Sequence, residues 1–267
     1  NGFYKYKSLA AHKLIYQVNK NIKVNLIESV IFDRGFDFNY LNPFMFYYPV
    51  SRFAGNNDNN QIGIELIFDD IFNSNFHLSL LIDEWDPDFT FKEDHENWFI
   101  YQLGWNRKNL LFESDKLILE YTWTDNRVYI NKNQDVDYFL NGYPIGFWAG
   151  PHTEHHFIKY NFEFLNHVIS FLLSNVKKGR QLTPDDITYI YENKGGNYER
   201  YLGGTEEKSI VGINVERKNN KFLTYTVGLN YLEWKNNKSD EIIQSLNLNK
   251  FYLNCKVNYS LPQINLN

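Results

Sequence analysis

The sequence predicts an all-β protein whose antiparallel strands follow one another in an up-and-down order. Three observations predict this fold class. Aromatic residues make up 18% of the 267 residues and stand beside β-branched residues in short runs, a composition that favours strands. Apolar and polar residues alternate with a period of two in many segments. Short polar turns separate several of these segments, which is typical of hairpins between neighbouring strands.

The alternation is strongest in seven segments. In residues 62–69, Ile62 and Ile64 share one face of the predicted strand, while Glu65 and Asp69 lie on the other. Such a strand has one apolar face and one face that contacts water. The seven segments are residues 22–32, 62–69, 76–85, 117–125, 156–166, 222–234 and 251–259, and weaker copies lie at 9–18, 98–105, 168–174 and 209–217.

The predicted connections are of two kinds. Short polar turns, such as 19–21 and 218–220, alternate with long stretches at residues 33–60, 86–97, 126–153, 176–205 and 235–246. Short turns at one end and long loops at the other are typical of transmembrane β-barrels of the bacterial outer membrane. A β-sandwich, the alternative for these strands, more often has medium-length connections at both ends.

One helix is predicted inside the fourth long stretch. Thr183 and Pro184, followed by two aspartates, are typical of a helix start, and Gly195 would end the helix. Aromatic residues stand at many strand ends, where a barrel would use them as girdles at headgroup depth. A sandwich would use the same rings as core or rim residues. They are Phe32, Trp85, Trp98, Trp105, Trp123, Tyr231 and Trp234.

The composition excludes several classes of protein. The formal net charge of −5 argues against a nucleic-acid-binding protein, because no basic face dominates. The single cysteine, Cys255, excludes a disulfide framework and a cysteine-ligated metal cluster. The sequence contains no run of about 18 apolar residues, so we predict no transmembrane helix. Barrel strands, apolar only at every second residue, are compatible with the mean hydropathy of −0.50.

Two clusters of titratable residues are candidates for a metal site or a catalytic site. Asp83, Glu84, Asp86 and Asp88 could bind calcium or support glycoside hydrolysis. Asp83 and Glu84, however, lie on opposite faces of a strand and cannot form an acid/base pair without a bulge. The simpler interpretation is a solvated loop mouth.

The histidines near residue 155 are the second cluster. His152, His155 and His156 are residue types that bind zinc, but the last two diverge on a strand and the helical zinc motif is absent. The sequence also contains no nucleophile elbow and no phosphate-binding loop. We therefore predict no catalytic residue, no metal site and no cofactor.

An ordered series of motifs in residues 9–86 goes beyond the alternation. The series consists of Ala11-His12-Lys13-Leu14, Glu28-Ser29-Val30-Ile31-Phe32, Arg34-Gly35-Phe36-Asp37, Tyr40-Leu41-Asn42-Pro43, Asp58-Asn59 and Leu81-Ile82-Asp83-Glu84. It resembles the capsule assembly protein Wzi family, outer-membrane β-barrels of Gram-negative bacteria. A further stretch, Gly142-Tyr143-Pro144-Ile145-Gly146 followed by Gly150-Pro151, is similar to a loop of that family, and the matched motifs together span roughly half of the chain.

The resemblance implies a non-catalytic barrel that binds or anchors capsular or related exopolysaccharide at the cell outer membrane. Its implied partners are outer-membrane lipid and the polysaccharide, with no nucleic acid, and the oligomeric state stays open. Barrels of the family have about eighteen strands after periplasmic helices, whereas this chain supplies about ten to twelve. We therefore expect one barrel domain over residues 1–267, either lacking an N-terminal portion or reduced in size. The end of the sequence lacks the usual terminal aromatic, so residues 251–259 are the expected closing strand.

The expected sugar site lies in residues 33–60 and in the acidic run. Aromatic faces cover the C–H patches of sugars, while Asn, Asp and Arg side chains satisfy their hydroxyls. The alternative is that Tyr40-Leu41-Asn42-Pro43 is a folded plug that braces the barrel wall. The residues predicted to line a polar mouth are Arg34, Asp37, Asn39, Tyr40, Asn42, Asp83, Glu84 and Trp85.

Two other functions stay open from the sequence. A porin-like passive channel would need an open charged lumen. A soluble β-sandwich enzyme acting on carbohydrate would need two converging carboxylates, and a second sheet would cover apolar faces such as Ile62/Ile64 and Val227/Leu229. In a barrel Cys255 faces lipid, whereas a sandwich buries it in a core.

Overall fold

Eleven strands form one antiparallel sheet in the computed structural model, and 63% of the chain is strand. The structure describes residues 7–53, 55, 57–85, 88, 97–192, 200–201, 203–217, 223–237 and 247–259. The strands of the sheet are β1 (Ser8–Asn19), β2 (Ile22–Phe32), β3 (Asn59–Ile71), β4 (Ser74–Trp85), β5 (Asn97–Lys108), β6 (Lys116–Thr124), β9 (Thr153–Phe164), β10 (His167–Gly179), β11 (Thr205–Arg217), β12 (Leu223–Asn236) and β13 (Asn247–Tyr259).

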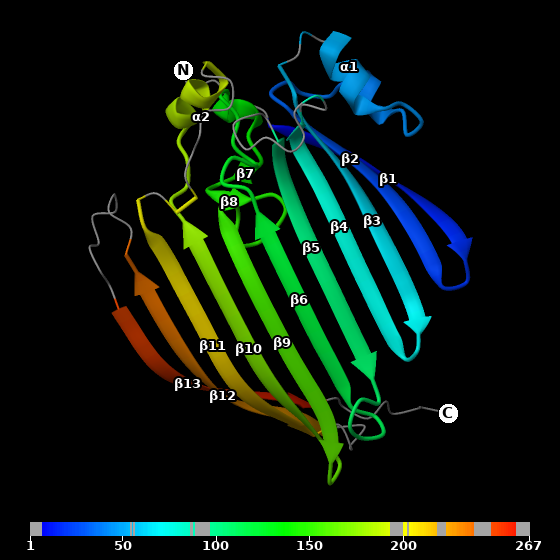
Figure 1. Ribbon diagram of the computed structural model, residues 1–267, viewed down its shortest axis with the longest axis vertical. Helices are drawn as coiled ribbons and strands as arrows, with labels where there is room; N and C mark the ends of the chain where they lie inside the picture. The colour runs from blue at the N-terminus through cyan, green and yellow to red at the C-terminus, as the bar shows by residue number, and fades with distance from the viewer. Residues whose placement is uncertain are drawn as a thin grey trace, which may run out of the picture.

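The up-and-down order is confirmed. Each strand pairs with its sequence neighbours in the sheet, and β6 pairs with β9 across the small hairpin of β7 (Phe139–Leu140) and β8 (Tyr143–Pro144). All eleven predicted segments are strands of this sheet. Short turns lie at one end of the sheet and the long connections at the other (Figure 1). The predicted turn at 218–220, Asp86, the predicted helix stop Gly195 and parts of four long connections lie outside the described residues.

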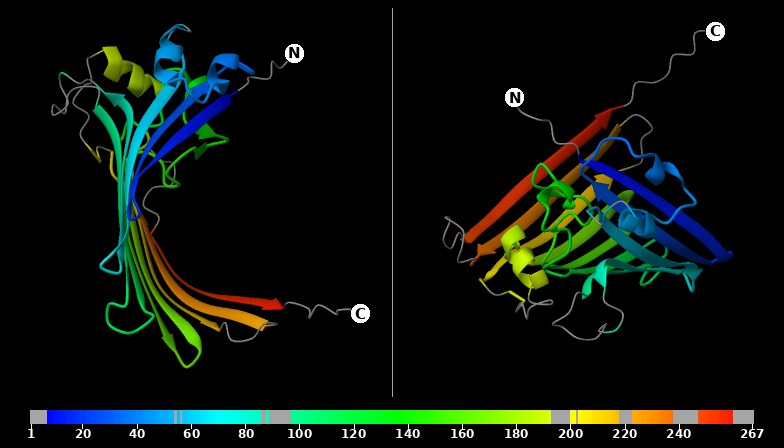
Figure 2. Two further views of the ribbon diagram at one scale, coloured as in Figure 1. Left: turned by 90° about the vertical axis from the view of Figure 1, so that its right-hand side faces the viewer. Right: turned by 90° about the horizontal axis from the view of Figure 1, so that it is seen from above.

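The sheet is strongly curved, with its edge strands β1 and β13 turning toward the same side (Figure 2). No pairing joins β1 to β13 among the described residues, so the sheet is an open trough and closure into a barrel stays a prediction. We call the concave side the inner face and the convex side the outer face. The segment 125–152, drawn in green, lies on the inner face near the long connections (Figure 2).

Two hydrophobic clusters lie at the long-connection end of the sheet, one on each face. On the inner face, Ile31 and Trp98 pack against the segment 125–152 and against α2 (Pro184–Glu192). On the outer face, the neighbouring residues Val30 and Phe32 pack against the connection between β2 and β3. That connection contains the 3-10 helix η1 (Phe38–Leu41) and α1 (Tyr47–Phe53), while a second 3-10 helix, η3 (Gln134–Val136), lies in the segment 125–152.

Away from these clusters, the outer face is an uncovered apolar band. No second sheet covers it in the part of the chain that the structure describes, so the sandwich arrangement is absent there. Cys255 is exposed on this face, opposite Val227. Exposed members of the band are Leu14, Leu26, Ile62, Ile64, Leu78, Leu103, Ile158, Leu173, Val211, Val227, Leu229 and Leu253.

The inner face is polar below the segment 125–152. Glu65 accepts hydrogen bonds from Lys13 and from Asn25, the latter at 2.9 Å, and Lys23 donates to Asp69 at 2.7 Å. Alternation within each strand therefore separates an apolar outer face from a charged and amide-rich inner face. No helix among the described residues is long and apolar enough to span a membrane.

The girdle prediction needs correction for two residues, and of the helices α1 and α2 the sequence predicts only α2. Trp98 and Trp234 do not belong to an outer girdle, because the phase of the alternation turns both rings inward, Trp98 into the inner cluster and Trp234 beside Lys208. The predicted helix after Thr183 is confirmed as α2. The helix α1 was not predicted, since its N-terminal N–H groups bind Glu28, a residue of β2 distant in sequence.

Candidate functional site

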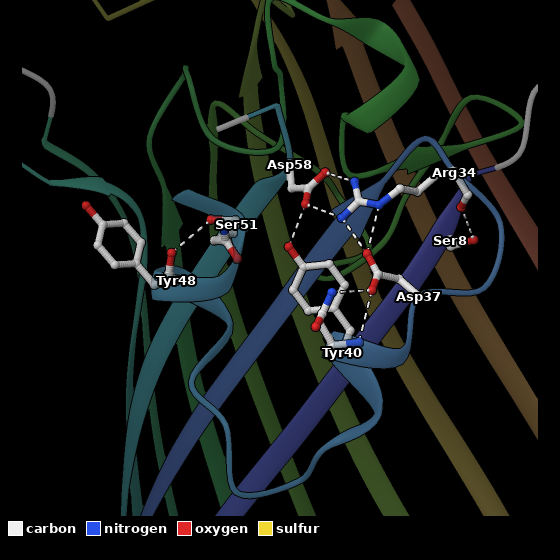
Figure 3. A network of polar contacts seen from close by, with 9 residues as sticks. Ser8, Arg34, Asp37, Tyr40, Tyr48, Ser51 and Asp58 are labelled. Atoms are coloured by element: carbon white, nitrogen blue, oxygen red, sulfur yellow. Dashed lines mark hydrogen bonds and ion pairs between the residues drawn. The ribbon is translucent and has the colours of Figure 1, made fainter. Parts of the chain in front are cut away.

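Arg34 is the centre of a polar cluster beyond the ends of β2 and β3 (Figure 3). Its guanidinium donates to both carboxylate oxygens of Asp58, with Nη1–Oδ1 at 2.6 Å and Nη2–Oδ2 at 2.8 Å. Its Nε donates to Oδ2 of Asp37 at 2.8 Å. The guanidinium also lies 5.1 Å from the ring centroid of Phe32, a cation–π distance. One cation thus joins two carboxylates and the outer hydrophobic cluster.

Tyr40 closes this cluster on its buried side. The hydroxyl donates to Oδ2 of Asp58 at 2.5 Å, and the ring packs 5.0 Å from Phe32 between centroids. Burial, followed by the bond to Asp58, raises the pKa of the Tyr40 hydroxyl above its usual value. The hydrogen bonds to Asp58 likewise raise the pKa of Arg34. Arg34 therefore stays charged and the Tyr40 hydroxyl stays protonated across the neutral pH range.

Asp37 fixes the path of the chain into η1. Its Oδ1 accepts from the backbone N–H and the side-chain amide of Asn39, each at 2.9 Å. Burial opposes ionisation of Asp37, but the bonds from Asn39 and Arg34 outweigh it and lower the pKa of the carboxyl. Asn42 ends η1, and its Oδ1 accepts from the N–H of Phe44 at 3.1 Å. These are Asx-type bonds that shape a loop.

The cluster joins four of the eight predicted site residues, Arg34, Asp37, Asn39 and Tyr40, while Asn42 lies at the end of η1, where its side chain accepts from Phe44. Most of their polar atoms bind one another, as the bracing interpretation expects. The groups that remain accessible are the exposed amides of Asn39 and Asn42 and one edge of Arg34, whose side chain is 36% exposed. The rings of Phe36 and Phe38 meet edge to face beside them at 4.8 Å. A rim of amides and aromatic rings is suited to a sugar.

Asp83 lies elsewhere, on the inner face. It occupies a β-bulge between Ile82 and Glu84, and its carboxylate accepts from Gln61 Nε2 at 3.0 Å and from the N–H of Tyr129 at 2.8 Å. This buried carboxylate holds the segment 125–152 against the sheet. The structure therefore does not bring Asp83 to the Arg34 cluster. Glu84 and Trp85 end β4, and their side chains lie outside what the structure describes.

A polar groove on the inner face was not singled out from the sequence. It has a volume of about 210 Å³ and lies across β3–β6 near the short-turn end. The signal for it was present, because these residues are the polar partners in the alternating segments. What the sequence does not reveal is which polar positions of different strands meet. The polar groups that line the groove are Asp69, Asn75, His77, Gln102, Asn106 and Glu120, and its lining also includes the apolar residues Ile67, Phe76, Trp105, Ile118 and Leu119.

A larger pocket, of about 560 Å³, lies between the start of β1 and the η3–β8 segment. Its wall includes Asp135, Asn141 and Gln181. Lys7 lies at its edge and donates to the carbonyls of Asp137 and Phe139, both at 2.9 Å, and to the carboxylate of Asp137. The pocket is therefore lined by polar groups on a braced loop.

The three histidines of the metal hypothesis diverge. His152 is fully buried, binding the carbonyl of Arg180 through Nδ1 at 2.8 Å and the N–H of Tyr201 through Nε2 at 2.9 Å. His155 bonds Ser174 at 3.0 Å, while His156 packs on Tyr121 on the other face. No group of three potential metal ligands was found among the described residues.

Comparison with known proteins gives no match. No family model, no curated protein and no solved structure is significantly similar to this chain.

Proposed function

We propose that the chain forms the wall of an outer-membrane β-barrel that holds capsular or related exopolysaccharide at the cell surface without catalysing a reaction. The observation that carries the proposal is the two-faced sheet, with an uncovered apolar band outside and charged and amide groups inside. Contiguous exposed apolar surface of this extent is uncommon in soluble monomers and marks contact with a membrane or a protein. Strands of 9 to 14 residues also suit a bilayer, since a tilted spanning strand needs about 9–11.

The polysaccharide part of the proposal is supported by the chemistry of the inner face and the rim. Amides, carboxylates and a histidine line the inner groove, and Asn39 and Asn42 stay exposed at the long-connection end. Such groups pair with sugar hydroxyls. The segment 125–152 on the inner face favours a binding role over an open porin-like channel, in which the lumen stays free.

The carboxylates of the Arg34 cluster favour binding over hydrolysis. A glycosidase needs a carboxylic acid with a raised pKa beside a second carboxylate. Here Arg34 binds both Asp37 and Asp58, and the pKa of Asp37 is lowered. The sandwich enzyme is therefore the weaker candidate.

The membrane part is tested by gel migration of the chain refolded in detergent or in vesicles of outer-membrane lipid. We expect the unheated sample to migrate faster than the boiled one, with β-type circular dichroism only when amphiphile is present. Monodisperse folded protein in plain buffer would overturn the membrane assignment.

The glycan part is tested on an array of bacterial capsular polysaccharides. Two binding variants are compared with the folded parent. The first carries His77→Ala and Gln102→Ala together in the groove, and the second carries Asn39→Ala at the rim. Leu103→Ala on the outer face is the matched control. We expect at least one binding variant to lose glycan retention while the control keeps it. No retention by the folded parent, or equal retention by all variants, contradicts the assignment of polysaccharide to these surfaces.

A further inference from the structure

The connection between β2 and β3 exposes an unusual number of large apolar side chains. Phe44 and Phe53 are 93% and 94% exposed, more than any other large apolar side chain among the described residues. Exposed aromatic side chains gathered in one segment mark a contact surface. The exposed large apolar side chains in residues 36–53 are Phe36, Phe38, Leu41, Phe44, Met45, Phe46, Tyr48 and Phe53.

This segment is fixed to the outer face of the sheet. Both carboxylate oxygens of Glu28 accept from the start of α1, from the N–H groups of Tyr47 and Tyr48, each at 2.8 Å. Tyr47 and Val50 then pack on the outer hydrophobic cluster. The Arg34–Asp58 pair joins the two ends of the connection. The exposed rings are therefore displayed from a braced support on the same face as the apolar band.

The chemistry of the segment fits the interface between lipid tails and headgroups. Aromatic rings favour that depth in membrane proteins, and an amphipathic element with apolar and cationic side chains can lie in the plane of the interface. Arg52 supplies the cation, since its side chain is exposed and its guanidinium lies 4.8 Å from the ring centroid of Tyr48. Guanidinium groups bind phosphate through paired hydrogen bonds.

We propose that residues 44–53 form a lipid-binding collar that enters the headgroup region of the leaflet at the long-connection end, with Arg52 binding a lipid phosphate. The inference rests on the proposed membrane wall, because the collar continues the apolar band of the outer face. It adds a site that the strands themselves do not provide. A lipid surface, rather than a protein partner, is favoured by this continuity.

The collar is tested with single-cysteine proteins that carry an environment-sensitive fluorophore in phosphatidylethanolamine/phosphatidylglycerol vesicles with nitroxide-labelled lipids. Cys255 in the parent reports on the wall. Phe44→Cys, made together with Cys255→Ser, reports on the collar, and Tyr143→Cys in the same background is the control, since Tyr143 is also highly exposed but lies on β8. We expect quenching at position 44 by shallow nitroxides, quenching at 255 by deep ones, and none at 143.

The outcomes separate the two proposals. Quenching at 255 with a water-like signal at 44 overturns the collar and leaves the wall. Quenching at 44 alone supports the collar and overturns the wall, while quenching at neither position overturns both. For Arg52, we expect Arg52→Gln to weaken binding of the full chain to phosphatidylglycerol vesicles by about fivefold, and Arg52→Lys to retain most of it. Unchanged binding of Arg52→Gln would overturn the assignment of a lipid phosphate to Arg52.

Discussion

At the scale of single residues, the Arg34–Asp58 pair is a two-bonded ion pair that joins the ends of the connection between β2 and β3. The carboxylate of Asp58 is 1% exposed and binds both Arg34 and Tyr40. We expect Asp58→Asn to lower the free energy of unfolding by about 1–3 kcal/mol, because a hydrogen-bonded charge is lost next to a retained guanidinium. Urea titration of the refolded chain measures this. Asp33→Asn, an exposed carboxylate close in sequence, should have no effect, and equal losses would show that the pair is not stabilising.

Asp115 makes the short-turn end of the sheet sensitive to acid. Its carboxylate accepts from the N–H groups of Leu110 and Leu111, at 2.6 and 2.8 Å, and from the hydroxyl of Tyr160 at 2.6 Å. Burial acts to raise the pKa, but these bonds outweigh it and lower the pKa of Asp115 to about 2. A folded-state pKa below the unfolded value of about 3.9 stabilises the fold above pH 4.

This stabilisation is lost as the pH falls from about 4 through about 2, because the proton then binds in both states. We expect Asp115→Asn to remove that part of the pH dependence and to be less stable than the parent at pH 7. Folded fraction against pH, followed by circular dichroism, measures both effects. Glu113→Gln is the control in the same turn, and a variant of Asp115 that keeps the parent's acid profile would refute the assignment.

The residues of the predicted site show what sequence reasoning can reach at this scale. Arg34, Asp37 and Tyr40 were placed together because they are close in sequence. Asp83 was expected to face them, but its direction depends on a bulge and on its bond to Tyr129, 46 residues away. Local pattern fixes which residues are neighbours along the chain. It does not fix which distant backbone group a carboxylate will bind.

At the scale of strands, adjacent residues of β5 test the assignment of the two faces. Leu103 belongs to the exposed outer band, and Gln102 lines the inner groove. In a membrane-spanning strand, arginine on the lipid face near the bilayer centre costs about 2–4 kcal/mol. We expect Leu103→Arg to lose stability in vesicles by that amount and Gln102→Arg to lose much less. Urea titration in vesicles gives both values, and a larger loss for Gln102→Arg would reverse the faces.

Strands and helices differed in how well the sequence predicts them. The eleven strands follow from alternation, which is local, and α2 follows from Thr183 and Pro184, which also lie within one turn. Asp186 confirms this local origin, since it accepts from the N–H of Thr183 at 2.7 Å. The helix α1 contains Pro49 and aromatic residues that are weak helix formers. Its start depends on Glu28 from β2, so only the folded sheet supplies the signal.

At the scale of the whole molecule, the described sheet ends in two edge strands, β1 and β13, that have no strand partner on their far sides among the described residues. Ten antiparallel pairings separate β1 from β13, so the two edge strands run in the same direction. Unpaired N–H and C=O groups are costly in a lipid environment, where only closed sheets persist. Alternation predicts each strand but carries no information on closure, since a curved sheet and a barrel share the same pattern of faces.

If these eleven strands close on themselves in the proposed membrane wall, β1 pairs in parallel with β13, either within one chain or between copies that face the same way. Cys255 on β13 offers a direct test, because a cysteine on the outer face of β1 can reach it only across the closed seam. We expect Leu14→Cys or Tyr16→Cys, oxidised in vesicles, to form a disulfide within one chain that is seen as a reducible, faster-migrating monomer. Cys255→Ser is the control and should remove the band. A disulfide that links two chains would instead mean that copies share the seam, and no disulfide at either position would contradict closure by β1 and β13.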